Sequence, residues 1–434
     1  MKRTYIKDLT DGNVRIKGYI EIIRDQKQMQ FVLVRDVTGV VQVTVSKTEQ
    51  PEIAEIFATL TRHSFVDVEG KCVHAPQVKN IGKEIYPKKV IVQSVAENLP
   101  IDENSSMDLK MDYQWITLRS ELKVLCFKIQ TAFEKHAVDF FVENGFIEIH
   151  TPKLTGLSSE GGSEVFEVKD YFGQKAYLTQ SPQLYKQMSM MAGFDKTFEI
   201  GEYFRANPSF TSRHDTEFTC IDVEISFIDS FTEVMDCEEA LLKYALTKVH
   251  DEFSAEYKRI LGKDMPTVPK DAFPRIPLLE VYKILEKECG HTVSRHLKGD
   301  LDPEGERLIS DYVKKKYGSD FVFVTSFPVK ARAFYTKKSD ENPELGECFD
   351  LIFKGTEITS GAQREHRYEQ LKGRIKENGI DPDKMTQYLD FFRYGAPTHG
   401  GFGLGITRVL TKLFDFPSVK DVTFLFRGPN RLLP

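Results

Sequence analysis

The stretch TFEIGEYFRANPSFTSRHDTEFTCIDVEISF, residues 197–227, contains two strand-forming runs that flank a polar loop. The loop carries Arg205, Arg213 and His214, and Glu217 and Phe218 follow it. A cationic loop beside an aromatic ring suits a nucleotide, because arginine binds phosphate and the ring stacks on the base. An ordinary polar hairpin is the alternative that this stretch alone leaves open.

A second polar region ends in EITSGAQREH, residues 357–366. The segment favours a strand, but a purely structural strand has little use for Glu357, Ser360 and Arg364 so close together. Asp350, in the preceding CFDLIF, and Glu357 could share a magnesium ion, which takes oxygen ligands and often bridges carboxylates to phosphates. Two surface acids on a strand pair are the alternative.

A third region, HGGFGLGITRVLTKLF, spans residues 399–414. Gly401, Gly403 and Gly405 would let the backbone approach a ligand closely, and the helix that they open carries Arg408. The spacing is not that of a dinucleotide-binding fingerprint, and no GxxxxGK[ST] phosphate loop occurs in the chain.

Composition limits the class of protein. A chain of 434 residues predicts two or three domains, and 41% hydrophobic with 29% charged residues is typical of soluble globular proteins. The net charge of −6 argues against a general DNA-coating protein, although a local patch could still bind nucleic acid. No apolar run approaches the ~20 residues that span a bilayer, so no membrane contact is expected. Six cysteines without CxxC spacing predict reduced thiols in a cytoplasmic protein.

The predicted fold class is α+β. Three strands, a helix at 51–60 and two more strands lie within residues 14–96, which is the order of a five-stranded OB barrel. A polar segment then reads as a hinge, and an amphipathic helix starting at Leu122 ends at Asn144-Gly145. The remaining strands predict a mainly antiparallel sheet, flanked by helices near 232–259, 277–288, 304–316 and 404–414. The predicted domains are an OB domain at 1–100, a hinge at 101–121 and a larger domain at 122–434.

Taken in order, FFVENGFIEIHTP, the FR…RHxTEF pattern and GxGxxR resemble motifs 1, 2 and 3 of the class II aminoacyl-tRNA synthetases. With the OB domain, the chain resembles their aspartyl, asparaginyl and lysyl subgroup. SEGGSEVF, YLTQSPQLYKQ, EITSGAQREHRYE and FRYGAPTHGGFGLG are most similar to the archaeal and eukaryotic aspartyl type. The resemblance covers nearly the whole chain. It implies that aspartate reacts with ATP to give aspartyl-adenylate, that the aspartyl group then passes to the 3′ end of tRNA, and that motif 1 forms a homodimer.

The resemblance also implies roles in binding ATP and Mg²⁺. Arg205 would hold the α-phosphate and Arg408 the γ-phosphate, while Phe218 and Arg408 would sandwich adenine. Asp350, Glu357 and Ser360 would bind magnesium. Arg205, Arg408 and Glu357 would form the catalytic set. The implied ATP-binding residues are Arg205, Arg213, His214, Glu217, Phe218, Glu357 and Arg408. One departure from the family pattern is Asn207, which stands where motif 2 usually has glutamate.

For the amino acid, the resemblance implies that Arg364 grips the side-chain carboxylate of aspartate and that Lys186 adds a second cation. Gln183 would hydrogen-bond the substrate, and Glu160 would lie on a loop that closes over its ammonium group. Ser360 completes the implied aspartate-binding set. Two buried cations facing a neutral carboxamide would be left partly unpaired, which favours aspartate over asparagine.

The OB domain would read the anticodon. Phe31 could stack on a base, and Gln42 and Glu84 match positions that read anticodon bases in the family. Strict archaeal aspartyl enzymes carry tryptophan in the first OB strand, where this chain has Glu21. This difference favours tRNA(Asn) as a possible second substrate beside tRNA(Asp).

Three other functions are compatible with parts of the pattern. An asparaginyl enzyme resembles the chain broadly but lacks the lysine at position 186. A stand-alone ligase that makes asparagine lacks the anticodon domain, so residues 1–100 argue against it. A non-catalytic tRNA-binding paralogue typically loses motif arginines, whereas Arg205, Arg364 and Arg408 are all present here.

Overall fold

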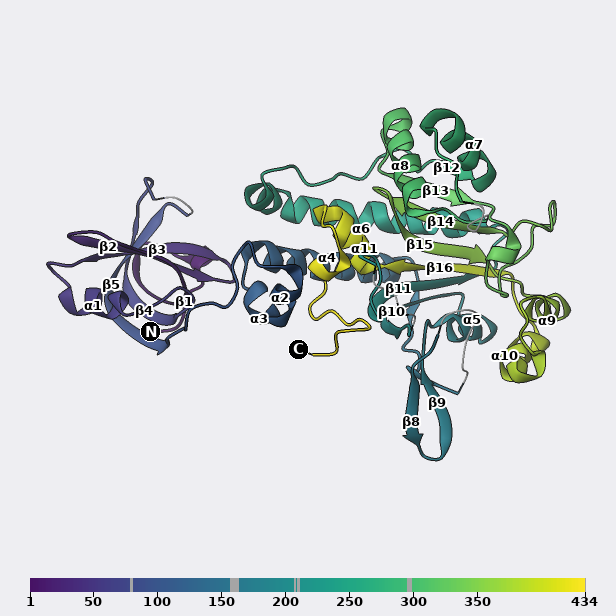
Figure 1. Ribbon diagram of the computed structural model, residues 1–434, viewed down its shortest axis with the longest axis horizontal. Coiled ribbons are helices and arrows are strands. Elements are labelled where there is room, and N and C mark those ends of the chain that lie inside the picture. Colours follow the sequence, from purple (N-terminus) through teal and green to yellow (C-terminus); the bar gives the residue numbers. More distant parts are fainter. Residues whose placement is uncertain (79–80, 157–163, 207, 209–210, 295–298, 434) are drawn as a thin grey trace. The chain divides into compact units, whose positions relative to one another are not determined.

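The computed structural model describes residues 1–78, 81–156, 164–206, 208, 211–294 and 299–433 (Figure 1). The chain divides into two compact units, Met1–Thr117 and Leu118–Pro434. The segment expected to be an irregular hinge contains two short helices, α2 (Met107–Asp112) and α3 (Gln114–Thr117), and both belong to the first unit. Ser106 caps the start of α2 by accepting a hydrogen bond from the Leu109 amide. The polar composition of the segment had suggested an irregular hinge, so this helix was not predicted.

The first unit is a closed barrel with strand order β1-β2-β3-β5-β4. This confirms the predicted OB fold. Val32 and Val34 are fully buried inside the barrel, while Phe31 and Leu33, which alternate with them, are only half-buried on its outer side. The elements are β1 (Gly12–Asp25), β2 (Met29–Asp36), β3 (Gly39–Ser46), α1 (Pro51–Ala58), β4 (Phe65–His74) and β5 (Lys83–Ser94).

The second unit is built on an eight-stranded sheet with order β12-β13-β14-β15-β16-β11-β10-β6. Neighbouring strands are antiparallel except for the pairs β12/β13 and β10/β6, which confirms the mainly antiparallel prediction. The strands are β6 (Ile147–Glu148), β10 (Lys196–Phe204), β11 (Glu217–Ser226), β12 (Arg275–Pro277), β13 (Phe321–Thr325), β14 (Cys348–Phe353), β15 (Thr356–Gln363) and β16 (His399–Gly405).

Helices cover this sheet and form its core. Helices α4 (Glu121–Glu143), α6 (Phe231–Leu261) and α11 (Ile406–Phe414) share one apolar cluster with β11 and β13–β16. Helices α7 (Leu278–Cys289) and α8 (Pro303–Tyr317) pack beside β12 and β13 (Figure 1). The four predicted helices after residue 230 are therefore confirmed. Three further helices are α5 (Gln183–Met191), α9 (Tyr368–Glu377) and α10 (Thr386–Phe391).

The second unit also contains a small sheet with strand order β7-β9-β8. Its strands are β7 (Leu154–Thr155), β8 (Glu167–Tyr171) and β9 (Gln174–Leu178). After β9, the Thr179 carbonyl accepts a hydrogen bond from the Phe204 amide, which ties the chain to β10 immediately before α5 begins. This connection brings α5 against β10 and β11 of the large sheet.

The glycine-rich stretch 399–405 is a central strand, β16, rather than the start of a helix. A Cβ atom at Gly401 would lie 2.0 Å from the Val223 carbonyl oxygen, and one at Gly400 would lie 2.8 Å from the Ala362 carbonyl oxygen. These glycines therefore allow close packing against neighbouring strands. The sequence-based prediction had been that Gly401 lets the backbone approach a ligand. Gly403 does line the pocket described below.

All six cysteines are free thiols. Among the described residues, no helix is both long and apolar enough to cross a membrane.

Candidate active site

A pocket of about 320 Å³ lies over the large sheet of the second unit. Side chains from α5, β10, β11, β15 and the segment 331–336 line it. The structure thus brings together six residues that the sequence assigned to two different substrates: Gln183, Lys186, Arg205, Phe218, Ser360 and Arg364.

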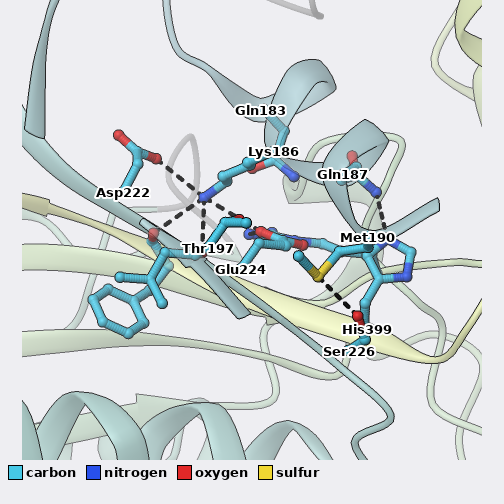
Figure 2. A network of polar contacts seen from close by, with 12 residues as sticks. Gln183, Lys186, Gln187, Met190, Thr197, Asp222, Glu224, Ser226 and His399 are labelled. Atoms are coloured by element: carbon cyan, nitrogen blue, oxygen red, sulfur yellow. Dashed lines mark hydrogen bonds and ion pairs between the residues drawn. The ribbon is translucent and has the colours of Figure 1, made fainter. Parts of the chain in front are cut away.

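Lys186 extends from α5 toward the sheet and is almost fully buried (Figure 2). Its Nζ donates hydrogen bonds to Asp222 Oδ1 at 3.0 Å and to the carbonyl oxygens of Val223 at 3.2 Å and Phe402 at 3.1 Å. Glu224 Oε2 lies 3.4 Å from the same nitrogen. Because an ammonium group has three N–H donors, a substrate would have to replace one of these partners to bind Lys186 directly.

Arg364, at the end of β15, forms a two-point ion pair with Glu224 on β11. Its Nε donates to Glu224 Oε1 at 3.0 Å and its Nη2 donates to Oε2 at 3.2 Å. Among the described residues, Nη1 of Arg364 donates no hydrogen bond, so this guanidinium, which lines the pocket, keeps donors for a ligand. A planar fork of this kind matches a carboxylate in geometry and charge.

The two carboxylates beneath the pocket differ in their electrostatics. Burial alone would raise the pKa of Glu224, but the cations of Arg364 and Lys186 hold it below its usual value. Burial raises the pKa of Asp222, and Lys186 opposes that rise. Glu224 therefore remains a fixed anion that orients Arg364, whereas Asp222 shares only the one cation and also lines the pocket.

A series of hydrogen bonds fixes the His399 ring near the Arg364–Glu224 ion pair. The Nδ1 of His399 lies 2.8 Å from the Pro397 carbonyl oxygen, which can only accept, so Nδ1 carries the hydrogen. The Nε2 then accepts from the Gln187 amide at 3.0 Å, and Gln187 in turn accepts a hydrogen bond from Tyr388. Burial lowers the pKa of His399 to about 4. This ring is therefore neutral near pH 7 and adds no charge beside Arg364.

Arg205 and Phe218 also line the pocket and lie beside each other. The Arg205 guanidinium carbon lies 5.0 Å from the centroid of the Phe218 ring, which is within the range of a cation–π contact. The two residues are neighbours because Tyr203 of β10 pairs with Phe218 of β11. An aromatic face with a guanidinium beside it can hold a base and a phosphate together.

Two other predicted phosphate ligands, Arg213 and Arg408, line a separate hollow of about 50 Å³. Arg213 Nη1 donates to both oxygens of Glu306, at 2.8 and 2.9 Å. Arg408 Nη1 donates to the Glu357 carbonyl at 2.8 Å and to its carboxylate at 3.3 Å. Arg408 is thus engaged with Glu357, while Phe218, its predicted partner in holding adenine, lines the larger pocket.

The three predicted magnesium ligands are not equivalent. Asp350 is buried, and both of its oxygens accept hydrogen bonds from Arg332, at 3.0 and 2.5 Å. Ser360 Oγ accepts a further bond from Arg332 at 3.3 Å. The Glu357 side chain is 38% exposed, so protein covers most of it. Burial raises the pKa of Glu357 to about 7 against the opposing Arg408 cation, and Asp350 and Glu306 add to the rise. As a set, these residues do not fit a Mg²⁺ ion, while Glu357 alone does.

The chain matches two protein-family models. The model for tRNA synthetases class II (D, K and N) matches residues 106–427, and the model for the OB-fold nucleic acid binding domain matches residues 14–93.

The chain belongs to the class II tRNA synthetases.

Named relatives agree with this placement. The chain is 38% identical to an aspartate–tRNA(Asp) ligase of Pyrococcus abyssi over 99% of its own length and 98% of that protein. It is 37% identical to an aspartate–tRNA(Asp/Asn) ligase of Aeropyrum pernix over 99% of its length and 97% of that protein. Both kinds of tRNA specificity therefore occur among relatives of similar identity.

Solved structures of class II synthetases are also similar. An asparaginyl-tRNA synthetase from Pyrococcus horikoshii, complexed with asparaginyl-adenylate, gives a TM-score of 0.90 at 29% identity and covers 100% of both chains. An aspartyl tRNA synthetase from Entamoeba histolytica gives 0.87 at 28% identity and covers 100% of this chain and 93% of that one. Both types share the fold, so the fold alone does not distinguish an aspartyl from an asparaginyl enzyme.

Two further predicted residues of this synthetase domain, His214 and Glu217, are not among the residues that line the pocket. Partial burial lowers the pKa of His214, and the cations of Arg408, Arg205 and Arg213 lower it further, so His214 lies among the candidate phosphate ligands. Glu217 is exposed at the start of β11 and does not line the pocket. Glu160 and Asn207 lie outside the described residues.

The synthetase's OB barrel brings its three predicted anticodon residues to one outer surface. Phe31 of β2 pairs with Thr44 of β3, and Gln42 of β3 pairs with Glu84 of β5. Glu84 accepts hydrogen bonds from Thr44 at 2.7 Å, from Tyr86 at 2.7 Å and from Gln42 at 3.3 Å. A half-buried ring beside oriented polar groups is an arrangement that binds unstacked bases.

Sequence reasoning missed four charged residues of this synthetase site: Asp222, Glu224, Glu306 and Arg332. Two of them had a signal. In CIDVEISF, Asp222 and Glu224 alternate with apolar residues, which places both acids on one face of a central strand. Acids at buried strand positions require cationic partners, so this pattern could have pointed to Lys186 and Arg364. Glu306 and Arg332 carry no comparable local signal, because their partners lie far away in sequence.

Proposed function

We propose that this class II synthetase activates L-aspartate with ATP and transfers the aspartyl group to the 3′ end of tRNA(Asp). The observation that carries the proposal is the charge of the pocket lining. Among the described residues, four cations line it, namely Lys186, Arg205, Arg332 and Arg364, against one carboxylate, Asp222. Aspartate bound beside the α-phosphate of ATP presents the complementary charges, with two carboxylates and a phosphate against one ammonium group.

For aspartate recognition, Arg364 supplies the principal contact. Glu224 holds its guanidinium on one edge and leaves Nη1 for the substrate's side-chain carboxylate. Lys186 adds positive charge, although its three donors are engaged with protein. Asp222 is the carboxylate placed to receive the ammonium group, in addition to the sequence-based assignment of Glu160. Gln183, whose Nε2 is buried without a partner among the described residues, has a donor available for the substrate.

The same electrostatics favour aspartate over asparagine. A carboxamide in place of the carboxylate would leave the Arg364 donors facing a neutral group in a buried site. Leaving a buried charge-assisted hydrogen bond unmade costs about 2–3 kcal/mol, which corresponds to roughly 30-fold to 150-fold in relative rate.

For ATP, the pocket wall formed by Arg205 and Phe218 is the candidate site of adenine and the α-phosphate. Arg213, His214 and Arg408 are the candidate ligands of the outer phosphates, and Arg213 and Arg408 would exchange their carboxylate partners for phosphate on binding. No side chain need act as a nucleophile, because the substrate carboxylate attacks the α-phosphate itself. The protein would position the reactants and neutralise the charge that develops on phosphate. Mg²⁺ would accompany ATP, with Glu357 as the residue that fits it and screening of phosphate charge as its contribution.

For tRNA, the outer surface of the OB barrel formed by Phe31, Gln42 and Glu84 is the candidate anticodon site. Strict archaeal aspartyl enzymes carry a tryptophan in the first OB strand. Glu21 of this chain stands there and forms ion pairs with Arg35 and Arg62. The proposal therefore extends to tRNA(Asn) as a second substrate, because this polar group replaces a bulky aromatic one.

We also propose a cytoplasmic homodimer. The edge strand β6 exposes Ile147, and the end of α4 exposes Val142, at 46% and 62% of their surfaces. An unpaired edge with apolar side chains suits a two-fold contact. Light scattering of the purified chain tests the stoichiometry, and Ile147→Asp should shift it toward the monomer.

Charging of tRNA transcripts with labelled aspartate tests the proposed function. We expect tRNA(Asp) to be charged to a plateau and tRNA(Asn) to be charged as well. If only tRNA(Asp) is charged, the extension to tRNA(Asn) is wrong while the main proposal stands. If neither is charged by folded protein with ATP and Mg²⁺, the main proposal fails.

A further inference from the structure

Arg332 is a cation of the pocket for which the sequence predicted no role. It follows the short 3-10 helix Val329–Ala331 and lines the pocket. Its guanidinium donates two hydrogen bonds to Asp350 and one to Ser360, and it lies 3.6 Å from the centroid of the Phe327 ring. Arg332 is therefore held by Asp350 of β14, Ser360 of β15 and a ring of its own segment, Phe327.

This arrangement competes with a metal ion for the same oxygens. Mg²⁺ requires oxygen lone pairs in a near-octahedral shell at about 2.0–2.1 Å. Both carboxylate oxygens of Asp350 already accept N–H groups, and the residue is only 5% exposed. A divalent ion bound there would also lie beside a fixed guanidinium, whose charge repels it.

Glu357 differs from Asp350 in each of these respects. Its side chain is 38% exposed, and Arg408 contacts only Oε1, at 3.3 Å. No partner of Oε2 is found among the described residues. Mg²⁺ at nucleotide sites is commonly held by one or two carboxylates together with substrate phosphates and water. Glu357 satisfies that requirement without Asp350.

We propose that Arg332 is a resident cation that takes the place of a metal ion at Asp350 and Ser360. Asp350 is then a positioning residue for Arg332, and the metal that accompanies ATP is held at Glu357. The inference deepens the proposed function and rests on it only for the use of a divalent cation with ATP. The Nε of Arg332, which is buried without a hydrogen-bond partner among the described residues, leaves this cation with one donor unused.

Binding of Mn²⁺, measured by electron paramagnetic resonance on the full chain with a non-hydrolysable ATP analogue, tests this inference. Glu357→Gln should weaken Mn²⁺ binding at least about 10-fold, because it removes a direct ligand. Asp350→Asn should change the affinity less than about 2-fold. Arg332→Met frees the Asp350 carboxylate, so the number of Mn²⁺ ions bound per chain should rise by one, and Arg332→Met combined with Asp350→Asn should abolish this gain.

Arg332→Lys is the matched control, since it keeps a cation at the site and should leave the number of bound ions unchanged. Thermal melts monitored by circular dichroism establish that each variant is folded. The inference is overturned if Asp350→Asn weakens Mn²⁺ binding as much as Glu357→Gln, or if folded Arg332→Met binds no additional ion. Aspartate and tRNA are absent from these samples. The Mn²⁺-binding result therefore remains interpretable even if the protein fails to activate aspartate.

Discussion

Arg364 and Glu224 face each other across the floor of the pocket through two hydrogen bonds of 3.0 and 3.2 Å, and both side chains are buried. A buried ion pair of this geometry gains little net stability over apolar packing. The ion pair instead orients Arg364, because the Glu224 carboxylate fixes the plane of the guanidinium and leaves the other edge of the guanidinium for a ligand. The selectivity proposed for this synthetase depends on that orientation.

Replacing Arg364 tests the role of this geometry. Arg364→Lys keeps the positive charge but loses the planar fork that Glu224 holds. We expect kcat/KM for aspartate in ATP–pyrophosphate exchange to fall by about 100-fold, which corresponds to about 2.7 kcal/mol. Arg367→Lys is the matched control, because Arg367 is more exposed and contacts Glu365 instead. Equal losses in the two variants would contradict the assigned role.

Gly401 is predicted to be essential to the same ion pair. A Cβ atom there would lie 2.0 Å from the Val223 carbonyl oxygen and 2.2 Å from Glu224 Oε2. Gly401→Ala should therefore displace Glu224, lower the unfolding free energy by about 1–3 kcal/mol and reduce aspartate activation. Denaturant unfolding and exchange kinetics measure the two effects.

Gly373 on α9 provides the control for that substitution. Apart from its chain neighbours and the backbone of its own helix, no described atom lies within 4 Å of a Cβ built at this glycine. Gly373→Ala should raise the unfolding free energy by up to about 1 kcal/mol through helix propensity, with activation unchanged. A Gly401→Ala protein as stable and active as Gly373→Ala would show that the close contact at Gly401 is not needed.

Glu238, on α6, is predicted to make stability depend on pH. The side chain is completely buried, and neither carboxylate oxygen has a hydrogen-bond partner among the described residues. Burial raises the pKa of Glu238 to about 8 from its ordinary value of 4.5. Because the folded pKa exceeds the unfolded one, this contribution to stability is complete below pH 4.5 and is lost as pH rises toward 8.

The loss from Glu238 amounts to at most about 4 kcal/mol of unfolding free energy at pH 8. Glu238→Gln should therefore gain stability relative to the wild type as pH rises from 4.5 to 8, because glutamine does not ionise. Urea unfolding at several pH values gives the difference, in which other titrating groups cancel. Glu286→Gln, at an exposed position of α7, should show no such trend. A difference between Glu238→Gln and wild type that is constant with pH would refute the assignment.

The OB barrel is predicted to contribute to tRNA binding and not to aspartate activation. Phe31→Ala removes the ring proposed to stack on an anticodon base, which is worth about 1–3 kcal/mol. We expect KM for tRNA to rise about 5-fold to 150-fold while aspartate-dependent exchange is unchanged. Val37→Ala, at an exposed position of the turn after β2, is the control. A loss of exchange in Phe31→Ala would place the effect in folding rather than in tRNA binding.

The sequence predicted those features that local periodicity and order encode. Alternation and the strand–helix–strand order identified the barrel, and the polar loop after β10 pointed to Arg205 and Phe218. The glycine-rich strand β16 was missed, because its conformation is imposed by close contacts with β11 and β15 and not by its own propensities. The partners of Asp350 and Arg213 were missed for a related reason. Arg332 and Glu306 are brought to them only by tertiary packing.

The central claim is that the cationic pocket selects aspartate, and amino-acid-dependent ATP–pyrophosphate exchange tests it most directly. Aspartate, asparagine and lysine are compared at equal concentration, with Mg²⁺ and without tRNA. The account predicts exchange with aspartate and at least about 30-fold slower exchange with asparagine, with none for lysine. Exchange with asparagine that equals or exceeds the rate with aspartate would contradict the account.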